Sequence, residues 1–377
     1  MLFQKIADTY HEFAILRDVN SCIDCDVCIG QCTYNVHFRD TVRSCVTSDN
    51  SMCVGCLRCS ALCPTGALSI RFNDFCNGSN GASQSALLRN IYTQAETGEQ
   101  QSCAGQERSV LPVYWDKLML VAGVAEDHLN AITPEFLLNK PLLLDIIPSI
   151  SINPNLRTAM KIAADKLNLA EIRDNEIYAD DGSCEYVRIA ATYNVAKLAL
   201  EAISGGAKVI VIDGTSGGYG PYSRNDSQLM PIELAIGVVD RTLRAEGMRE
   251  DILVIAASGI RCSSDIIKAL ALGADGVSIA AAMMIAAGCS LCGSCNTGKC
   301  PWGIATVESN LCKRQNPELA AEQMINLVNA WNQEIDEMLE CLETASLLDV
   351  RGNKDKLRAV GLSETEMKIL GIEHAGL

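Results

Sequence analysis

Cysteine is the residue type whose number and spacing carry the most chemistry in this sequence. The chain has 19 cysteines among 377 residues, and twelve of them fall into three tight groups. Two groups share the spacing C-x2-C-x2-C-x3-C, and each cysteine of the second lies 31 residues after its counterpart in the first. The first group is Cys22, Cys25, Cys28 and Cys32, and the second is Cys53, Cys56, Cys59 and Cys63. Regular spacing of this kind in a large chain indicates metal or redox chemistry rather than a disulfide framework.

The duplicated spacing predicts two iron–sulfur clusters. Three closely spaced thiolates can hold three corners of a cube, and in two-cluster ferredoxins the fourth ligand comes from the other motif. We therefore assign one [4Fe-4S] cluster to Cys22, Cys25, Cys28 and Cys63, and a second to Cys53, Cys56, Cys59 and Cys32. Zinc is the alternative, because C-x2-C pairs also bind zinc, although zinc does not require a third cysteine at the same spacing. The segment from about Ser21 to Asn73 resembles a bacterial-type two-cluster ferredoxin domain, with Pro64 after the last cysteine and Thr33 replacing the other proline.

The third cysteine group lies far along the chain, between Gly288 and Gly303. It has the spacing C-x2-C-x2-C-x4-C and again ends in Cys-Pro, which favours cluster ligation over four structural thiols. Its members are Cys289, Cys292, Cys295 and Cys300. Cys45 and Cys76 complete no further spacing, and we interpret them as ordinary small apolar residues.

Alternating apolar runs and helical stretches indicate the elements that position the third group. Val- and Ile-rich strands separated by helices predict a parallel sheet covered by helices. The expected strands are 142–147, 186–190, 208–212, 252–256 and 276–279, and the expected helices are 156–169, 195–204, 231–246 and 265–272. Glycine-rich loops follow two strands, at Asp213–Gly218 and Ser258–Arg261, where backbone amides could hold a phosphate. Plain tight turns would explain these glycines equally well.

Composition bounds the domain organisation and the classes of partner. The formal net charge of −15 argues against a nucleic acid or an anionic membrane surface as partner. No apolar run approaches the length of a membrane span, so we expect a cytoplasmic protein. The predicted domains are a two-cluster domain at 1–75, a linker rich in Gly, Ser, Gln and Asn at 76–112, an α/β domain at 113–310 and a helical region at 311–377. An amphipathic helix is expected over 316–347, and the four histidines form no ligand set.

Three motifs in order identify a family resemblance. They are Val209–Asp213 with Gly214 and Gly217-Gly218, then Ser258-Gly259-Ile260-Arg261, then the third cysteine group with Pro301 and Gly303. Together they resemble the FMN-binding synthase domain of glutamate synthase, most closely the archaeal type with a ferredoxin module in the same chain. The resemblance implies a (β/α)8 barrel, FMN at the strand ends, a [3Fe-4S] cluster beside it, and reduction of 2-iminoglutarate to glutamate.

The resemblance also implies the positions of the cofactor sites. Cys289, Cys295 and Cys300 match the ligands of the [3Fe-4S] cluster, and Arg188 lies where the family has a lysine near the flavin ring. The residues implied for FMN are Arg188, Asp213, Gly214, Gly217, Gly218, Ser258, Gly259, Ile260, Arg261, Ala280 and Ala281.

Several features depart from the family pattern. Cys292 is an additional thiol, which makes a four-ligand [4Fe-4S] cluster possible in the third group. Ala280-Ala281 replaces a Gly-Thr phosphate pair, and Ala257-Ser258-Gly259 replaces an Asp-Gly-Gly. Residues 141–303 number 163, against about 250 for a typical barrel. We expect the missing units between Leu169 and Glu185, which leaves an incomplete barrel of about five strands.

Two functions follow. The first is an iron–sulfur oxidoreductase subunit related to glutamate synthase, with electrons passing between the two N-terminal clusters, the third cluster and FMN. The alternative is a non-catalytic wiring or scaffold subunit that has lost flavin. Either function implies a redox partner or other subunits, such as a separate amidotransferase or reductase.

Overall fold

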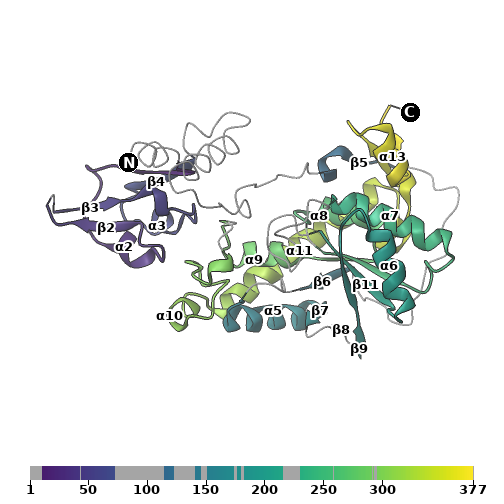
Figure 1. The fold of residues 1–377 in the computed structure, drawn as a ribbon, viewed down its shortest axis with the longest axis horizontal. Coiled ribbons are helices and arrows are strands. Elements are labelled where there is room, and N and C mark those ends of the chain that lie inside the picture. The colour runs from purple at the N-terminus through teal and green to yellow at the C-terminus, as the bar shows by residue number, and fades with distance from the viewer. Residues whose placement is uncertain are drawn as a thin grey trace, which may run out of the picture. The chain divides into compact units, whose positions relative to one another are not determined.

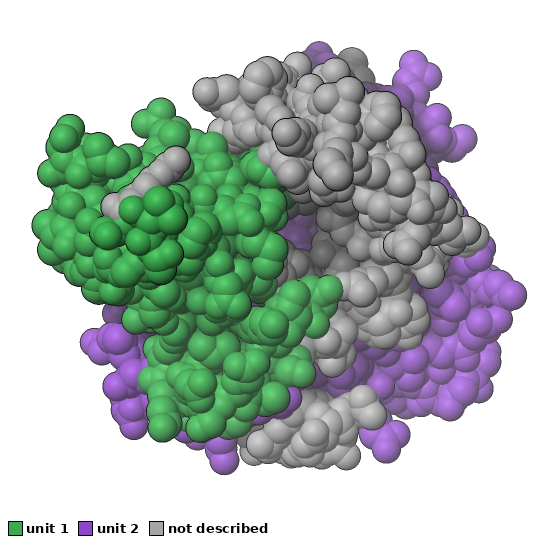
Figure 2. Space-filling model, turned by 60° about the vertical axis from the view of Figure 1, so that its left-hand side comes forward, with its two compact units in different colours: residues 1–109, 149–155, 288–315 green, residues 110–148, 156–287, 316–377 purple. Residues whose placement is uncertain are grey.

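The computed structural model describes most of the chain, as two compact units. The described residues are 11–42, 44–72, 114–122, 141–145, 151–173, 176–179, 182–214, 230–257, 259–290, 292 and 295–376. Unit 1 comprises residues 1–109, 149–155 and 288–315, and unit 2 the remainder (Figure 2). Residues 288–315 therefore belong to the same unit as both N-terminal cysteine motifs. The predicted domain boundaries at 75, 112 and 310 stay predictions.

The sequence duplication in unit 1 is also a duplication of structure. The first half forms β1 (Phe13–Arg17), α2 (Val27–Gln31) and β2 (His37–Asp40), and the second forms β3 (Cys45–Ser48), α3 (Arg58–Ala61) and β4 (Leu68–Phe72) (Figure 1). Strand β1 pairs antiparallel with β4, and β2 pairs antiparallel with β3. The first strand of each half thus pairs with the last strand of the other, and α2 contacts α3. This exchange of strands brings the last cysteine of each motif close to the first three cysteines of the other motif.

The remainder of unit 1 contains the third cysteine group. It includes the 3-10 turn η4 (Cys295–Thr297) and the short helix α10 (Ser309–Cys312). Asn153 fastens this segment, because its side-chain amide donates to the carbonyl oxygens of Gly303 and Cys312, and its backbone N–H donates to Ile304. Asn153 is fully buried, so these bonds satisfy groups that would otherwise be costly to remove from water.

Unit 2 is built on an eight-stranded sheet with the order β10-β11-β12-β13-β6-β7-β8-β9. The first six strands in this order run parallel, and β7, β8 and β9 are connected antiparallel. The strands are β6 (Leu142–Leu144), β7 (Ala170–Arg173), β8 (Glu176–Ala179), β9 (Gly182–Glu185), β10 (Val187–Ala190), β11 (Val209–Asp213), β12 (Leu253–Ala257) and β13 (Gly276–Ser278). Strands β11 and β12 are buried along their whole length, as expected for a sheet covered on both faces.

The parallel part of the sheet curls into a half-barrel. Arg188 on β10 donates to Asp145, which follows β6, at 2.7 Å. These strands are four positions apart, so in a flat sheet they would be separated by about 19 Å at ~4.8 Å per strand. A single core cluster also combines Leu143, Ile172, Val211 and Ile255 from four strands. The curl places these apolar side chains, together with Arg188 and Asp145, on one concave face of the sheet.

The strand count corrects the sequence prediction of about five strands. Six parallel strands are present, and the segment between Leu169 and Glu185, where we expected only a deletion, contains β7 and the hairpin β8–β9. These strands are short and rich in charge, so they lack the apolar runs that mark the others.

Helices cover the outside of the half-barrel. They are α5 (Pro154–Leu167), α6 (Val195–Ser204), α7 (Ile232–Ala245), α8 (Ser263–Leu272), α9 (Ala280–Ala286) and α11 (Pro317–Cys341) (Figure 1). Neighbouring helices α6, α7 and α8 pack against each other and against β10, β11 and β13. Helix α11 confirms the expected C-terminal helix but ends at Cys341 rather than 347, and Leu319 of its predicted apolar stripe is exposed. Within the described ranges, every helix is too short or too polar to cross a bilayer.

The C-terminal region is tied to the half-barrel in two ways. Strand β14 (Leu357–Ala359) pairs with β5 (Leu118–Leu120) and with β15 (Glu373–His374). The helix α12 (Leu347–Val350), the turn η5 (Lys354–Lys356) and the helix α13 (Glu364–Leu370) complete this region, and α13 packs on α7.

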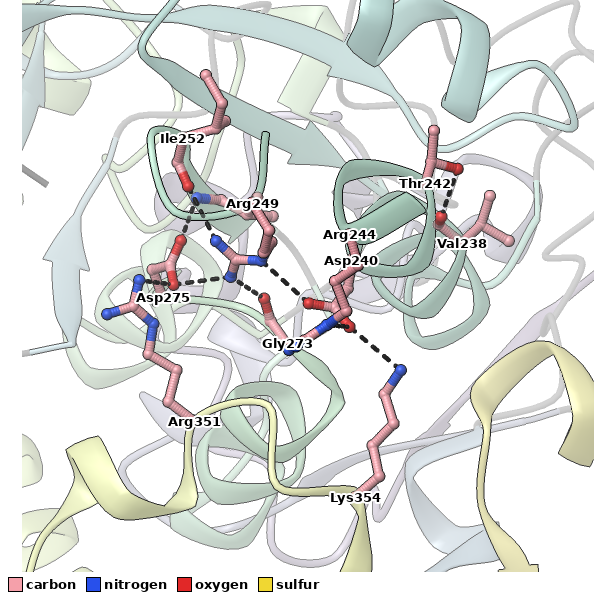
Figure 3. A network of polar contacts seen from close by, with 11 residues as sticks. Val238, Asp240, Thr242, Arg244, Arg249, Ile252, Gly273, Asp275, Arg351 and Lys354 are labelled. Atoms are coloured by element: carbon pink, nitrogen blue, oxygen red, sulfur yellow. Dashed lines mark hydrogen bonds and ion pairs between the residues drawn. The ribbon is translucent and has the colours of Figure 1, made fainter. Parts of the chain in front are cut away.

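A buried ion network lies at the amino ends of the strands (Figure 3). Arg249, just before β12, bonds Asp240 of α7 at 3.0 Å and Asp275, just before β13, at 2.8 Å. Lys354 contacts Asp240 at 3.2 Å, and Arg351 contacts Asp275. Because functional groups of barrels gather at the opposite, carboxyl ends of the strands, this network is structural.

Candidate functional site

The two N-terminal cysteine loops adopt a backbone conformation suited to holding an anion. Asp24 and Asp26 of the first loop have φ of 50° and 58°, and Gly55 and Leu57, 31 residues later, have φ of 65° and 62°. Left-handed residues of this kind turn successive N–H groups toward one point, as in many phosphate and iron–sulfur sites. Three of the four are not glycine, so the conformation carries strain that the surrounding structure must hold. At Gly55 a Cβ would lie 2.4 Å from the ring of Phe13, so only glycine fits.

The four thiols predicted for the first cluster line one cavity. Its wall includes Cys22, Cys25 and Cys28 from the first motif and Cys63 from the second. Cys28 is buried in the small core of this unit, whereas Cys25 is exposed. The cavity therefore reaches the surface on the side of Cys25. The structure brings the predicted set together, and ligation itself stays a prediction.

The four thiols predicted for the second cluster also gather in one place. Burial, together with the neighbouring thiols Cys53, Cys56 and Cys32, raises the pKa of Cys59 to about 12. Burial raises the pKa of Cys56 to about 11. Cys32, from the first motif, is thus an electrostatic neighbour of the three cysteines of the second. In the metal-free chain the thiols of Cys56 and Cys59 stay protonated at neutral pH, so cluster binding there releases protons and depends on pH.

The third cysteine group forms its own four-thiol neighbourhood, which includes the additional Cys292. Burial, with Cys289, Cys292 and Cys300 nearby, raises the pKa of Cys295 to about 12. Cys292 is also among the thiols that raise the pKa of Cys56. The third group therefore lies beside the second motif.

A set of polar and ring contacts fixes the third group against the second motif. The indole N–H of Trp302 donates to the carbonyl oxygen of Cys56 at 2.8 Å. The guanidinium of Arg58 lies 4.9 Å from the centroid of the Trp302 ring and donates to Gln31 at 2.9 Å. Arg314 donates to the backbone oxygens of Pro301 and Gln31 at 2.7 and 3.2 Å. We name Trp302, Arg58 and Arg314 the latch.

The arrangement of the thiols fits clusters. Within the described ranges no group of three or more Cys, His, Asp or Glu side chains is placed to hold a single metal ion. An iron–sulfur cube binds each of its four thiolates at a different iron, so its ligands surround a volume rather than one point. The cavity, the left-handed loops and the gathered thiols suit such a group.

Unit 2 has a second polar site, at the carboxyl ends of the half-barrel strands. Arg188 donates to Asp145 at 2.7 Å and to Asp213, the last residue of β11, at 3.1 Å. The hydroxyl of Ser278, the last residue of β13, donates to Asp145 at 3.1 Å. Burial opposes the charge on Arg188, but Asp145 and Asp213 outweigh it and raise its pKa. Asp145 and Asp213 therefore neutralise the charge of Arg188, the residue that the family resemblance places near the flavin ring.

The other residues predicted for FMN have varied surroundings. The N–H of Gly214 donates to the carbonyl oxygen of Ala257 at 3.0 Å. Gly259 is exposed with φ of 76°, and Ile260 is buried. Arg261 is bound by Asp116 at 2.8 Å and Asp265 at 2.9 Å. Ala280 and Ala281 begin α9 and are half-buried, while Gly217, Gly218 and Ser258 lie outside the described residues.

Sequence reasoning missed several residues that contact the predicted cluster ligands or Arg188. Arg17 contacts two thiols of the first set, Trp302 and Arg58 hold the third group, and Asp145 pairs with Arg188. The Cys-Pro-Trp sequence at 300–302 was a partial signal for Trp302. Cys45, at the start of β3, is half-buried, and Cys76 lies outside the described residues.

Two family patterns match this chain. The pattern described as a conserved region in glutamate synthase matches residues 182–344. The pattern described as a 4Fe-4S binding domain matches residues 46–69, which include the second cysteine motif and lie in unit 1.

Curated relatives match almost the whole chain. The archaeal-type glutamate synthase [NADPH] of Thermotoga maritima is 32% identical, over 97% of this chain and 98% of the relative. That of Dehalococcoides mccartyi is 30% identical, over the same shares. The archaeal glutamate synthase [NADPH] of Methanocaldococcus jannaschii is 48% identical over a shorter stretch, which covers 51% of this chain and 38% of the relative.

The alignments locate the shortfall in length inside the chain. The alignment with the T. maritima protein has 497 positions, whereas this chain has 377 residues, so at least 120 positions of that relative have no counterpart here. Both ends of the relative are matched, so these positions are internal. The half-barrel of six parallel strands is consistent with such a loss.

Solved structures overlap only in part. Flavocytochrome b2 with sulfite bound is 18% identical with a TM-score of 0.32, over 48% of this chain and 39% of its own. A lactate oxidase from Pediococcus acidilactici is 18% identical with a TM-score of 0.31, over 55% and 41%. Overlap this low does not define the function of the half-barrel.

Proposed function

Because the chain belongs to the glutamate synthase family, we propose that it is an iron–sulfur flavoprotein subunit that passes electrons through three clusters to FMN. Bound clusters supply one-electron carriers, which is the usual reason to combine them with a two-electron flavin on one chain. The N-terminal part of unit 1 would be a ferredoxin-like two-[4Fe-4S] domain, which its duplicated β-α-β halves support.

The residues assigned to each cluster follow the gathered thiols. Cys22, Cys25, Cys28 and Cys63 would hold the first, and Cys53, Cys56, Cys59 and Cys32 the second. Cys289, Cys295 and Cys300 would hold the third, with Cys292 as the fourth ligand of a [4Fe-4S] rather than a [3Fe-4S] cluster. The shared neighbourhood of all four thiols favours the four-ligand form.

The main support for electron transfer between the clusters is that the third cysteine group packs against the second motif. Cys292 neighbours Cys56, and Trp302 bonds the carbonyl oxygen of that same cysteine. The second cluster, rather than the first, would therefore be the neighbour of the third cluster. The order of transfer would be first, second, third, with the exposed Cys25 side of the first cavity facing the redox partner.

FMN would bind at the carboxyl ends of the half-barrel strands. Its phosphate and ring would meet the loops at Gly214–Gly218 and Ser258–Arg261 and the start of α9. The neutralised Arg188 and the engaged N–H of Gly214 favour the second candidate function, an electron-wiring subunit without flavin.

We propose that this half-barrel does not by itself complete an active site for glutamate synthesis from 2-oxoglutarate and ammonia. At least 120 internal positions of the T. maritima relative have no counterpart here. We therefore propose that another subunit completes the active site, and that a separate amidotransferase or reductase supplies ammonia or electrons.

Iron and flavin counts on anaerobically purified protein test this proposal. About 12 irons with about one FMN per chain is the result expected for three four-iron clusters and a flavin enzyme. The same iron without flavin, even after soaking in FMN, supports the wiring subunit. About eight irons or fewer, enough for only two four-iron clusters, would contradict both.

Trp302→Phe tests the junction between the second and third sites. Loss of the hydrogen bond to Cys56 and weaker stacking by Arg58 should lower the stability of unit 1 by about 1–2 kcal/mol. Iron content should stay unchanged, while the magnetic interaction between the two clusters, seen by electron paramagnetic resonance, should weaken. Trp331→Phe, in α11 of unit 2, is the matched control. An unchanged interaction in Trp302→Phe would refute the assigned role of the latch.

A further inference from the structure

Arg17 is a cation built into the wall of the first thiol cavity. It is the last residue of β1, and the antiparallel pairing of β1 with β4 places it opposite Leu68, five residues after Cys63. Among the described residues that line the cavity it is the only lysine or arginine. Its position thus follows from the exchange of strands between the two halves.

The guanidinium of Arg17 is directed at sulfur atoms. One terminal nitrogen lies 3.4 Å from the Sγ of Cys22, and the other lies 3.6 Å from the Sγ of Cys28. An arginine side chain stays protonated in proteins whatever its surroundings. Arg17 therefore stays charged beside two ligands of the proposed first cluster.

Two neutral side chains, the buried His37 and the half-buried Ser48, hold Arg17 in this orientation. Its second terminal nitrogen donates to the hydroxyl of Ser48 at 3.4 Å, and this hydroxyl lies 2.7 Å from Nδ1 of His37. Burial, and then the charge of Arg17, lower the pKa of His37 to about 4. The imidazole is neutral at pH 7 and lies within hydrogen-bond distance of the Ser48 hydroxyl, so neither group adds a charge beside Arg17.

The nearby carboxylates are engaged elsewhere. Asp26 pairs with Arg39 at 2.6 Å, and Asp24 accepts the backbone N–H of Val46 at 2.8 Å. In the second half of the duplication, the position equivalent to Arg17 is Ser48, which carries no charge. The two duplicated sites thus differ in this cation.

We propose that Arg17 raises the reduction potential of the first cluster and so sets it apart from its duplicate. The inference rests on the proposed first cluster. Reduction adds one electron, and hence one negative charge, to the group held by the thiolates. A guanidinium bonded to two of those sulfurs stabilises the reduced form, since charge and hydrogen bonds to sulfur set such potentials.

A redox titration of the full chain, followed by electron paramagnetic resonance, tests this role. Cys25→Ser first identifies which signal belongs to the first cluster, because Cys25 is its exposed ligand. In Arg17→Gln that signal should titrate at lower potential. At the wild-type midpoint its reduced-to-oxidised ratio should fall about tenfold, which is 59 mV for a one-electron couple. The other clusters should titrate as before.

Two further variants separate charge from structure. Arg17→Lys keeps the charge without the paired donors and should give an intermediate potential. Arg71→Gln removes an exposed arginine of β4 that does not line the cavity, and it should leave the potential unchanged.

The outcomes are distinct. A potential of the first cluster that does not change in Arg17→Gln at full iron content overturns the inference. So does loss of iron in Arg17→Gln combined with an unchanged potential in Arg17→Lys, because Arg17 would then be only structural. If Cys25→Ser changes neither iron content nor any signal, the proposed first cluster itself fails.

Discussion

Arg249→Met is expected to lower the free energy of unfolding of unit 2 by about 3–5 kcal/mol, because it breaks a buried ion network. Arg249 is only 4% exposed and bonds both Asp240 and Asp275. It also donates to the carbonyl oxygens of Ile252 and Gly273, which are left without this donor in the variant. The network joins α7, the starts of β12 and β13 and the C-terminal segment (Figure 3).

Urea unfolding of the full chain, followed by a probe in unit 2, measures this loss. Arg241→Met is the matched control, because Arg241 also belongs to α7 but is exposed and makes one hydrogen bond, to the carbonyl oxygen of Lys368. It should change the free energy of unfolding by less than about 1 kcal/mol. Equal effects of the two substitutions would show that the network contributes no more than a surface contact.

Glu233 should make unit 2 less stable as the pH rises from 4.5 to 7. Burial, and to a smaller extent the neighbouring Asp265, raise the pKa of this carboxyl from 4.5 to about 7. Below pH 4.5 both the folded and unfolded chains hold the proton. Between pH 4.5 and 7 only the unfolded chain releases it, so the free energy of unfolding falls by about 3 kcal/mol across this window. Above pH 7 both chains have released the proton, so Glu233 no longer makes the free energy of unfolding depend on pH.

Unfolding curves of Glu233→Gln at several pH values between 4 and 8 test this prediction. The amide does not titrate and can still accept the backbone N–H of Trp115, which bonds Glu233 at 3.0 Å. The difference in stability between the variant and the wild type should therefore grow in favour of the variant with rising pH. Glu201→Gln, at an exposed position in α6, should give a constant difference. A constant difference for Glu233→Gln as well would mean that Glu233 ionises normally in the folded chain.

The family and the iron–sulfur oxidoreductase class were predictable from sequence and are confirmed by the relatives. Motif order, such as Asp213-Gly214 before Gly259-Ile260-Arg261 before the third cysteine group, can be read from a single sequence because each motif is a short local pattern. Element positions were also predictable where apolar runs were long. Helix α6 begins and ends at the expected residues, and β11 and β12 lie within one residue of the expected limits.

The strand count was not predictable in the same way. Strand β7 and the hairpin β8–β9 are short and charged, so hydrophobic periodicity does not reveal them. Strand β7 pairs with the edge of β6 that faces away from β13, and β13 lies more than 130 residues after β6 in the chain. Likewise, the pairing of Arg188 with Asp145 joins strands four positions apart in the sheet. The sequence shows both residues but not the curvature that brings them together.

The sequence by itself determined which residues could hold clusters, because cysteine spacing and the repeat after 31 residues are local properties of the chain. Only the tertiary structure decided that the third group lies beside the second motif, and that a cation faces the first. Thr33 bonds the carbonyl oxygen of Lys299, 266 residues away, and Arg17 reaches Cys22 and Cys28 through the pairing of β1 with β4. Such contacts depend on how separate segments pack, and no local pattern encodes that packing.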